Sequence, residues 1–115
     1  MNSSSKSRGI IRGTTPTLYI VVTGEQLEDS TPYVTIEQPC GVEIIKKGAD
    51  LIKERGDDYC LLAVPLTQME TLSLQEGRAM MHMRWIDKDG MAGAARNKRS
   101  FPVYDVLQEG VITYE

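Results

Sequence analysis

The stretch that decides the fold lies at residues 77–90 and reads GRAMMHMRWIDKDG. One register of its alternating side chains carries no charge and consists of Ala79, Met81, Met83 and Trp85. The other register carries the charges and consists of Arg78, Met80, His82, Arg84 and Ile86. Alternation with a period of two residues is typical of a β-strand with one face in a core. We therefore predict a central strand with Trp85 buried between two sheets and Arg84 outside.

The end of this strand has the composition of a tight turn. Asp87-Lys88-Asp89-Gly90 places two turn-forming carboxylates before a glycine, which can adopt the positive φ that such reversals require. The chain should reverse here and form a hairpin. The residues that follow, 91–95, are small and permissive, and they predict no strand of their own.

Similar strand signals recur along the chain, separated by turn residues. Val34 and Ile36 alternate with polar residues, and the turn Pro39-Cys40-Gly41 predicts a second hairpin. Residues 49–55 read as a loop or a short strand. The remaining predicted strands lie at residues 17–22, 33–38, 42–47, 59–64 and 100–107.

One short helix is predicted at residues 67–72. Thr67 and Glu70 match the capping-box pattern, in which each side chain accepts a hydrogen bond from the other residue's free backbone N–H. Six or seven short strands with a single short helix predict an all-β protein, an immunoglobulin-like β-sandwich. A small open barrel is the competing architecture.

The chain has 115 residues, which is the size of a single domain. We assign residues 12–112 to that domain, residues 1–11 to a disordered basic arm and residues 113–115 to a tail. The arm contains a serine-rich run with little apolar surface to offset the entropy of ordering. It also lacks the apolar middle region of a signal peptide, so we expect a cytoplasmic protein with reduced cysteines.

Composition argues against several partners. No apolar run approaches the length of a membrane span, so we expect no membrane contact. The net charge is −3, and Lys6, Arg8 and Arg12 are the only charged residues in the first twelve, so the rest of the chain is more acidic still. Nucleic-acid binding requires a coherent basic face, which such a body lacks.

We predict no catalytic residue, no metal ligand and no cofactor. His82 is the only histidine, and we place it on the solvated side of its strand. Cys40 and Cys60 lack further ligands nearby, and we assign Cys60 to the core and Cys40 to a turn. The basic cluster at residues 96–99 precedes Phe101, as in some single-strand binders, but one such cluster is more often a solvated loop.

Three predicted strands are apolar on both registers, although a strand in a two-layer sandwich needs only one apolar face. Their outward residues predict an interface, with a homo-oligomer or a larger assembly covering it. The alternative is that loops or the helix cover them. The predicted interface residues are Tyr19, Val21, Leu61 and Tyr104.

Several motifs carry a family resemblance: RGTTPT at 12–17, YVTIEQ at 33–38, LTQMETL at 66–72, Asp89-Gly90, and the run from Leu107 through Gly110-Val111-Ile112. They resemble small proteins encoded in prophages and phage-derived elements of Gram-positive bacteria. More distantly, the order of helix, glycine, central strand and Asp-Gly turn is similar to that of the amino-terminal immunoglobulin-like domain of phage baseplate upper proteins.

This resemblance implies a structural or accessory protein of a phage tail or baseplate. Such a protein acts by contact with other phage proteins or with itself, in the host cytoplasm or in the virion. The family has no catalytic residues to transfer, so we do not expect an enzyme. The alternative function is a carbohydrate- or host-surface-binding sandwich, although Trp85, the best platform for a sugar, is assigned to the core.

Overall fold

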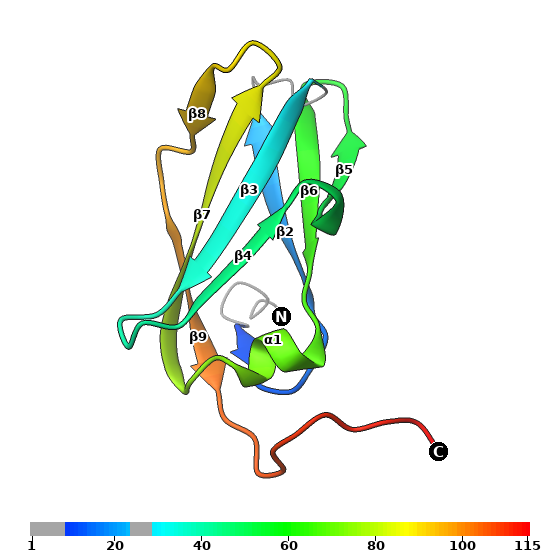
Figure 1. Cartoon of the computed structure of the whole chain (residues 1–115), viewed down its shortest axis with the longest axis vertical. Helices are drawn as coiled ribbons and strands as arrows, with labels where there is room; N and C mark the ends of the chain where they lie inside the picture. The colour runs from blue at the N-terminus through cyan, green and yellow to red at the C-terminus, as the bar shows by residue number, and fades with distance from the viewer. Residues whose placement is uncertain (1–8, 24–28) are drawn as a thin grey trace, which may run out of the picture.

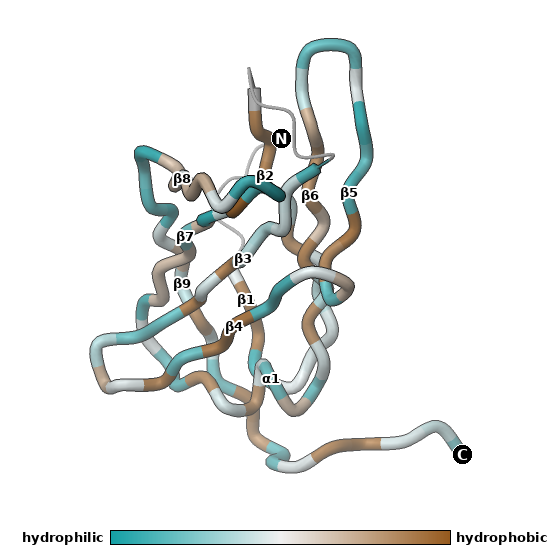
Figure 2. Tube along the Cα trace, turned by 45° about the horizontal axis from the view of Figure 1, so that its top comes forward, coloured by the Kyte–Doolittle hydropathy of each residue, from teal (hydrophilic) through white to brown (hydrophobic). Residues whose placement is uncertain are grey.

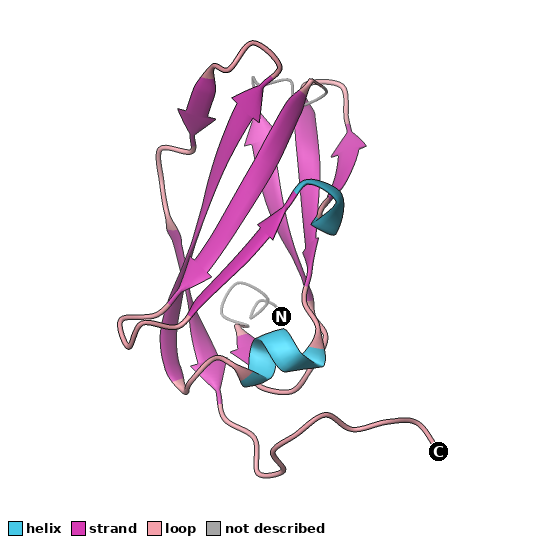
Figure 3. Cartoon of the chain, viewed as in Figure 1, coloured by secondary structure: helices cyan, strands magenta, loops and turns pink. Residues whose placement is uncertain are grey.

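Two β-sheets pack face to face in the computed structural model, which describes residues 9–23 and 29–115 (Figures 1 and 3). The large sheet has the strand order β1-β9-β7-β3-β4, with β8 also paired to β7, and the small sheet has the order β2-β6-β5. The strands are β1 (Ile10–Ile11), β2 (Thr17–Thr23), β3 (Ser30–Glu37), β4 (Glu43–Lys47), β5 (Ile52–Arg55), β6 (Tyr59–Pro65), β7 (Gly77–Asp87), β8 (Ala92–Ala94) and β9 (Arg99–Tyr104). The helices are η2, a 3-10 turn at Gly48–Asp50, and α1 at Gln68–Leu72.

This strand order confirms the predicted all-β sandwich and excludes the barrel. Strands β9-β7-β3-β4 and β2-β6-β5 have the order of the two sheets of an immunoglobulin-like domain, with α1 in the connection between β6 and β7. The described residues form nine strands, more than the six or seven predicted. The unpredicted ones are β1 and β8, which have too few residues to show a period, whereas β5 is the short strand that was one of the two alternatives for residues 49–55.

Strand β7 is the centre of the large sheet. It pairs antiparallel with β3 from Asp87 to Met80 on one side, and with β9 and then β8 on the other. Ala79, Met81 and Met83 are buried, as predicted, at 0%, 3% and 2% exposure. The hairpin after β7 also forms, since Gly90 has φ +84° and its N–H donates to the Asp87 carbonyl oxygen.

The prediction for Trp85 was wrong in its degree of burial. Trp85 follows the inward register and packs against the core, but it is only partly buried because it lies near the end of β7. Its indole lies over Gly93 of β8, where a Cβ atom would come within 2.6 Å of the ring. The aromatic ring therefore closes the rim of the sandwich instead of filling its centre.

The core lies between the sheets. Its large-sheet members include Val34 and Ile36, both fully buried, and its small-sheet members include Leu62 and Val64, also fully buried. Cys60 is buried with them, as predicted. Burial of these alternate residues is what selects the register of each strand, because a slip by one residue would turn the whole set to solvent.

Helix α1 confirms the predicted capping box. The Glu70 N–H donates to Thr67 Oγ1 at 3.1 Å, and the Thr67 N–H donates to Glu70 Oε1 at 2.9 Å. Burial by itself raises the pKa of Glu70, but the Thr67 N–H and the ammonium group of Lys46, 2.9 Å away, outweigh it and lower that pKa. The helix is thus fixed at its start and tied to β4.

Several predicted boundaries were wrong. The arm does not extend to residue 11, because Ile10 is 1% exposed and β1 pairs in parallel with β9; residues 1–8 of the predicted arm lie outside the described residues. Of the two alternatives predicted for residues 49–55, a short strand is present as β5, and it follows the 3-10 turn η2. The last strand ends at Tyr104 instead of residue 107. These segments are decided by pairing with distant strands, which local sequence does not report.

The contact between Trp85 and Gly93 gives a test of the fold. We expect Gly93→Ala to lower the free energy of unfolding by roughly 1–3 kcal/mol, because the added methyl group must displace the indole. The emission of Trp85 should shift towards that of free tryptophan. Ala94→Ser, at an exposed neighbouring position, is the control and should change neither the melting temperature nor the emission. Unchanged emission in Gly93→Ala would show that the ring does not lie over this glycine.

Candidate protein-binding surfaces

Three of the four predicted interface residues share one surface, the outer face of the small sheet. Val21 lies directly opposite Leu61 in the ladder between β2 and β6, and directly opposed residues point to the same side. Tyr19 lies two residues from Val21 on the same side. Tyr19 and Val21 are 51% and 60% exposed, whereas Leu61 is half-buried.

Other apolar side chains enlarge this surface. Ile52 of β5 lies opposite Ala63, which in turn lies opposite Tyr19, and Tyr59 follows the same register at the start of β6. Ile52 and Tyr59 are 53% and 44% exposed. Glu54 is the only charged side chain among the described outward positions of the three strands. We call the set Tyr19, Val21, Ile52, Tyr59, Leu61 and Ala63 the small-sheet face.

The fourth predicted residue, Tyr104, does not belong to the small-sheet face. It lies on β9 in the large sheet, next to Ile11 in the parallel pair with β1. Both side chains are about half exposed, at 48% for Tyr104 and 50% for Ile11. The four residues therefore form no single interface, because β2 and β9 belong to opposite sheets of the sandwich.

A hollow of about 340 Å³ opens on the outer face of the large sheet, between β4 and β8. Tyr33 lies directly opposite Lys47 on β4 and Arg84 on β7, so two cationic side chains flank one tyrosine. The Lys47 ammonium is 6.0 Å from the centre of the tyrosine ring. The lining of this large-sheet hollow consists of Tyr33, Thr35, Ile45, Arg84, Trp85, Ile86 and Ala92.

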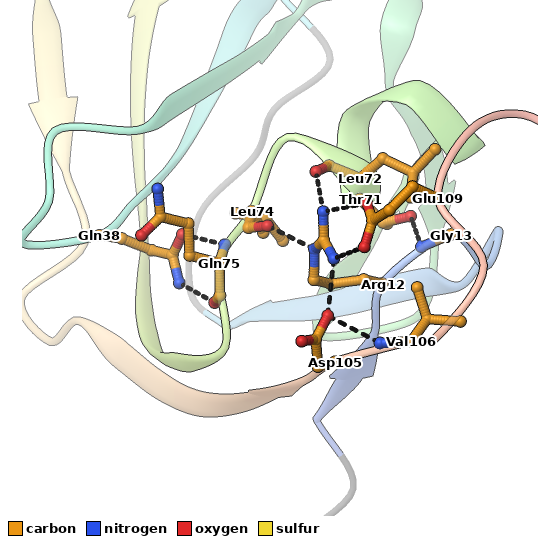
Figure 4. Close-up of polar contacts among 10 residues, drawn as sticks. All are labelled: Arg12, Gly13, Gln38, Thr71, Leu72, Leu74, Gln75, Asp105, Val106 and Glu109. Atoms are coloured by element: carbon orange, nitrogen blue, oxygen red, sulfur yellow. Dashed lines mark hydrogen bonds and ion pairs between the residues drawn. The ribbon is translucent and has the colours of Figure 1, made fainter.

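A polar cluster around Arg12 closes the end of the sandwich where α1 lies, and it is shown in Figure 4. The five N–H groups of a guanidinium all need acceptors when the group is removed from water, and the Arg12 side chain is only 14% exposed. Nε donates to the Leu74 carbonyl oxygen at 2.7 Å, and Nη2 donates to the Leu72 carbonyl oxygen at 2.9 Å. The remaining contacts go to two carboxylates, Asp105 at 2.6 Å and Glu109 at 2.7 and 2.9 Å.

These contacts lower the pKa values of both carboxylates. The pKa of Asp105 is lowered by the backbone N–H of Val106 and by the guanidinium of Arg12. The pKa of Glu109 is lowered by its paired hydrogen bonds with Arg12. Both carboxylates are therefore ionised in the folded protein, and they hold the segment after β9 against the start of the chain.

Two further sets of hydrogen bonds between side chains and backbone lie near this cluster. The buried Thr71 hydroxyl accepts from the Gly13 N–H at 2.9 Å and donates to the Thr14 carbonyl oxygen at 2.8 Å. The Gln38 amide exchanges two hydrogen bonds with the backbone of Gln75, at 2.7 and 2.8 Å. The start of the chain, the turn after β3 and the segment around α1 are thereby joined through side chains.

The residues considered for chemistry are dispersed. His82 Nε2 lies 2.8 Å from the Ala95 carbonyl oxygen and donates to it. The residue is also half-buried, so it is not the solvated residue that was predicted. Cys40 is exposed, and it and Cys60 are free thiols. The residues 96–99 are exposed, but Phe101 is in the core and cannot stack on a base. In the described parts of the chain, no three His, Cys, Asp or Glu side chains are grouped to hold a metal ion.

Sequence reasoning missed the Arg12 cluster and the large-sheet hollow. The sequence placed Arg12 at the start of the domain but gave it no acidic partner, because its two carboxylates lie 93 and 97 residues away. The one signal in the sequence was position along the chain. Arg12 lies just before the first long strand, and Asp105 and Glu109 lie just after the last strand. The hollow combines side chains from four strands, and its strand β8 was not predicted.

Comparison of the chain with protein-family models, with curated proteins and with solved structures finds no match. No helix in the described residues has the length and apolar character needed to cross a membrane. The resemblance to prophage proteins therefore rests on the sequence motifs alone.

The Arg12 cluster gives a second test. We expect Arg12→Met to lower the free energy of unfolding by roughly 1–3 kcal/mol, because the Leu72 and Leu74 carbonyl groups lose their donor. Amide hydrogen exchange in residues 105–112 should become faster. Arg78→Met is the control, since Arg78 is exposed and bonds only Ser100 through its side chain. Equal exchange in both variants would contradict the role of Arg12.

The same cluster predicts a pH dependence. Because the pKa values of Asp105 and Glu109 are lowered in the folded state, their contribution to stability is present above their ordinary values of 3.8 and 4.5 and is lost as the pH falls through the folded-state values. We expect the wild-type melting temperature to fall in this acid range more steeply than that of Arg12→Met. Parallel curves for the two proteins would contradict this linkage.

Proposed function

We propose that this protein is a structural or accessory component of a phage or prophage, associated with the tail or baseplate, and that it acts by protein–protein contact. The observation that carries this proposal is the apolar small-sheet face. The outer face of an antiparallel sheet is ordinarily polar because it meets water. Here Tyr19, Val21 and Ile52 are each more than half exposed. Contiguous exposed apolar side chains are typical of interaction surfaces.

A second copy of the chain is the partner that we favour for this face. The face carries one charged side chain, Glu54, at its border, so two copies can meet across a twofold axis without placing many like charges together. Tyr19 and Tyr59 supply the rigid aromatic area that contributes most at protein interfaces. The resemblance to prophage proteins supports the same assignment, because such proteins work in assemblies.

The carbohydrate-binding alternative has weaker support. A sugar site combines an exposed aromatic platform with carboxylate or amide groups. Trp85 is partly buried against Gly93, and the residues that line the large-sheet hollow include neither a carboxylate nor a side-chain amide. A non-enzymatic role is also part of the proposal, because His82 and the free thiols of Cys40 and Cys60 lie apart.

Sedimentation velocity at increasing protein concentration tests the proposal. We expect the wild-type chain to self-associate and Tyr19→Glu to weaken that association by about 2 kcal/mol or more, since it buries a charge at an apolar contact. Tyr104→Glu is the matched control, because Tyr104 is 48% exposed against 51% for Tyr19 but lies on the other sheet. A strictly monomeric wild-type protein, or equal loss in both variants, would remove the small-sheet face as the interface.

A further inference from the structure

The segment that follows β9, residues 105–115, displays apolar side chains to solvent. Leu107 and Tyr114 are completely exposed, at 102% and 101%, and Val111 and Ile112 are 53% and 58% exposed. The segment leaves the body of the domain beside α1, and its Val-Ile pair forms the brown stretch near the C-terminus in Figure 2. Val-Ile-Thr-Tyr at 111–114 has high β-propensity, yet these residues pair with no strand in the described structure.

The backbone of this segment is nevertheless held in place. Asp105 and Glu109 bind Arg12. The Gln68 side chain then exchanges two hydrogen bonds with the backbone of Ile112, each 2.9 Å long. Because its position is fixed, the segment presents its apolar side chains in a defined place instead of collapsing on the domain. Such pre-organisation lowers the entropic cost of binding a partner.

The large-sheet hollow combines apolar walls with a cationic side chain, and both properties complement those of residues 105–115. Ile45 and Ile86 form apolar walls and are 52% and 39% exposed. Arg84 is exposed beside them, and its side chain has no hydrogen bond or ion pair in the described structure. Residues 105–115 contain Asp105, Glu109 and Glu115 and no lysine or arginine. Since the first two carboxylates are engaged by Arg12, Glu115 is the one available to pair with a cation.

We propose that residues 111–115 of a second copy of this chain bind in the large-sheet hollow. Ile112 and Tyr114 lie one strand period apart and place their side chains against the apolar walls, while the Glu115 carboxylate pairs with Arg84. The same copy cannot fill its own hollow. Ile112 is held beside α1, at the end of the domain opposite β8 (Figure 1), and three extended residues reach only about 10 Å.

The consequence is a head-to-tail contact. The segment and the hollow are different surfaces, so each copy offers one of each, and such contacts propagate into rings or filaments instead of stopping at a pair. The inference rests on the proposed function in that the partner is again a copy of this chain. It uses a different surface, however, and stands or falls separately from the small-sheet face.

A peptide of residues 110–115 with blocked ends, Gly-Val-Ile-Thr-Tyr-Glu, tests the inference against the full-length protein. Titration calorimetry measures this binding directly. We expect saturable binding that Arg84→Glu weakens about tenfold or more. A peptide with Lys in place of Glu115 should bind Arg84→Glu more tightly than the original peptide does. Ile45→Lys, at a second exposed position, should also weaken binding.

Tyr19→Glu separates this inference from the proposed function. That variant should lose association through the small-sheet face and still bind the peptide with wild-type affinity. Absence of binding by calorimetry at millimolar peptide would overturn the inference. So would equal affinity in wild type, Arg84→Glu and Ile45→Lys, because binding would then take place elsewhere. Self-association that is unaffected by Tyr19→Glu bears on the proposed function alone.

Discussion

The guanidinium of Arg12 is the interaction on which the arrangement of this domain depends. It is largely removed from water, and each of its five N–H groups has an acceptor. Those acceptors come from two distant parts of the chain: the end of α1 and the segment after β9. A single side chain thereby closes one end of the sandwich and sets the direction in which the C-terminal segment leaves. Removing it would leave buried carbonyl groups without a donor, which costs more than the interaction contributes when formed.

The domain can expose apolar side chains without losing its fold because its core does not need them. The core between the sheets is complete, with Val34, Ile36, Leu62 and Val64 fully buried. The side chains outside it are therefore not part of the folding core. Many of them lie on the small-sheet face, in the large-sheet hollow and along the segment after β9, whereas others, such as Ile11, Tyr104 and Met69, lie elsewhere. A domain with three such surfaces is suited to contact with several neighbours.

The polar side chains that are buried serve structural pairings: Thr71 holds the backbone at residues 13 and 14, Gln38 holds Gln75, and Lys46 binds Glu70. Each of these side chains is thus hydrogen-bonded within the domain. The proposed role in phage assembly therefore depends on the shape and apolar character of surfaces, together with motifs that resemble those of prophage proteins.

The sequence by itself determined the features that depend on neighbouring residues. Alternation identified β7 and its buried register, and Thr67 with Glu70 identified α1, because periodicity and capping are local. The tertiary structure decided what depends on distant partners. Ile10 enters the core only because β9 lies beside it, Arg12 finds carboxylates more than 90 residues away, and Tyr104 is separated from Tyr19 by the sandwich. Long-range strand pairing leaves no local pattern, since each strand is compatible with several neighbours until the core selects one.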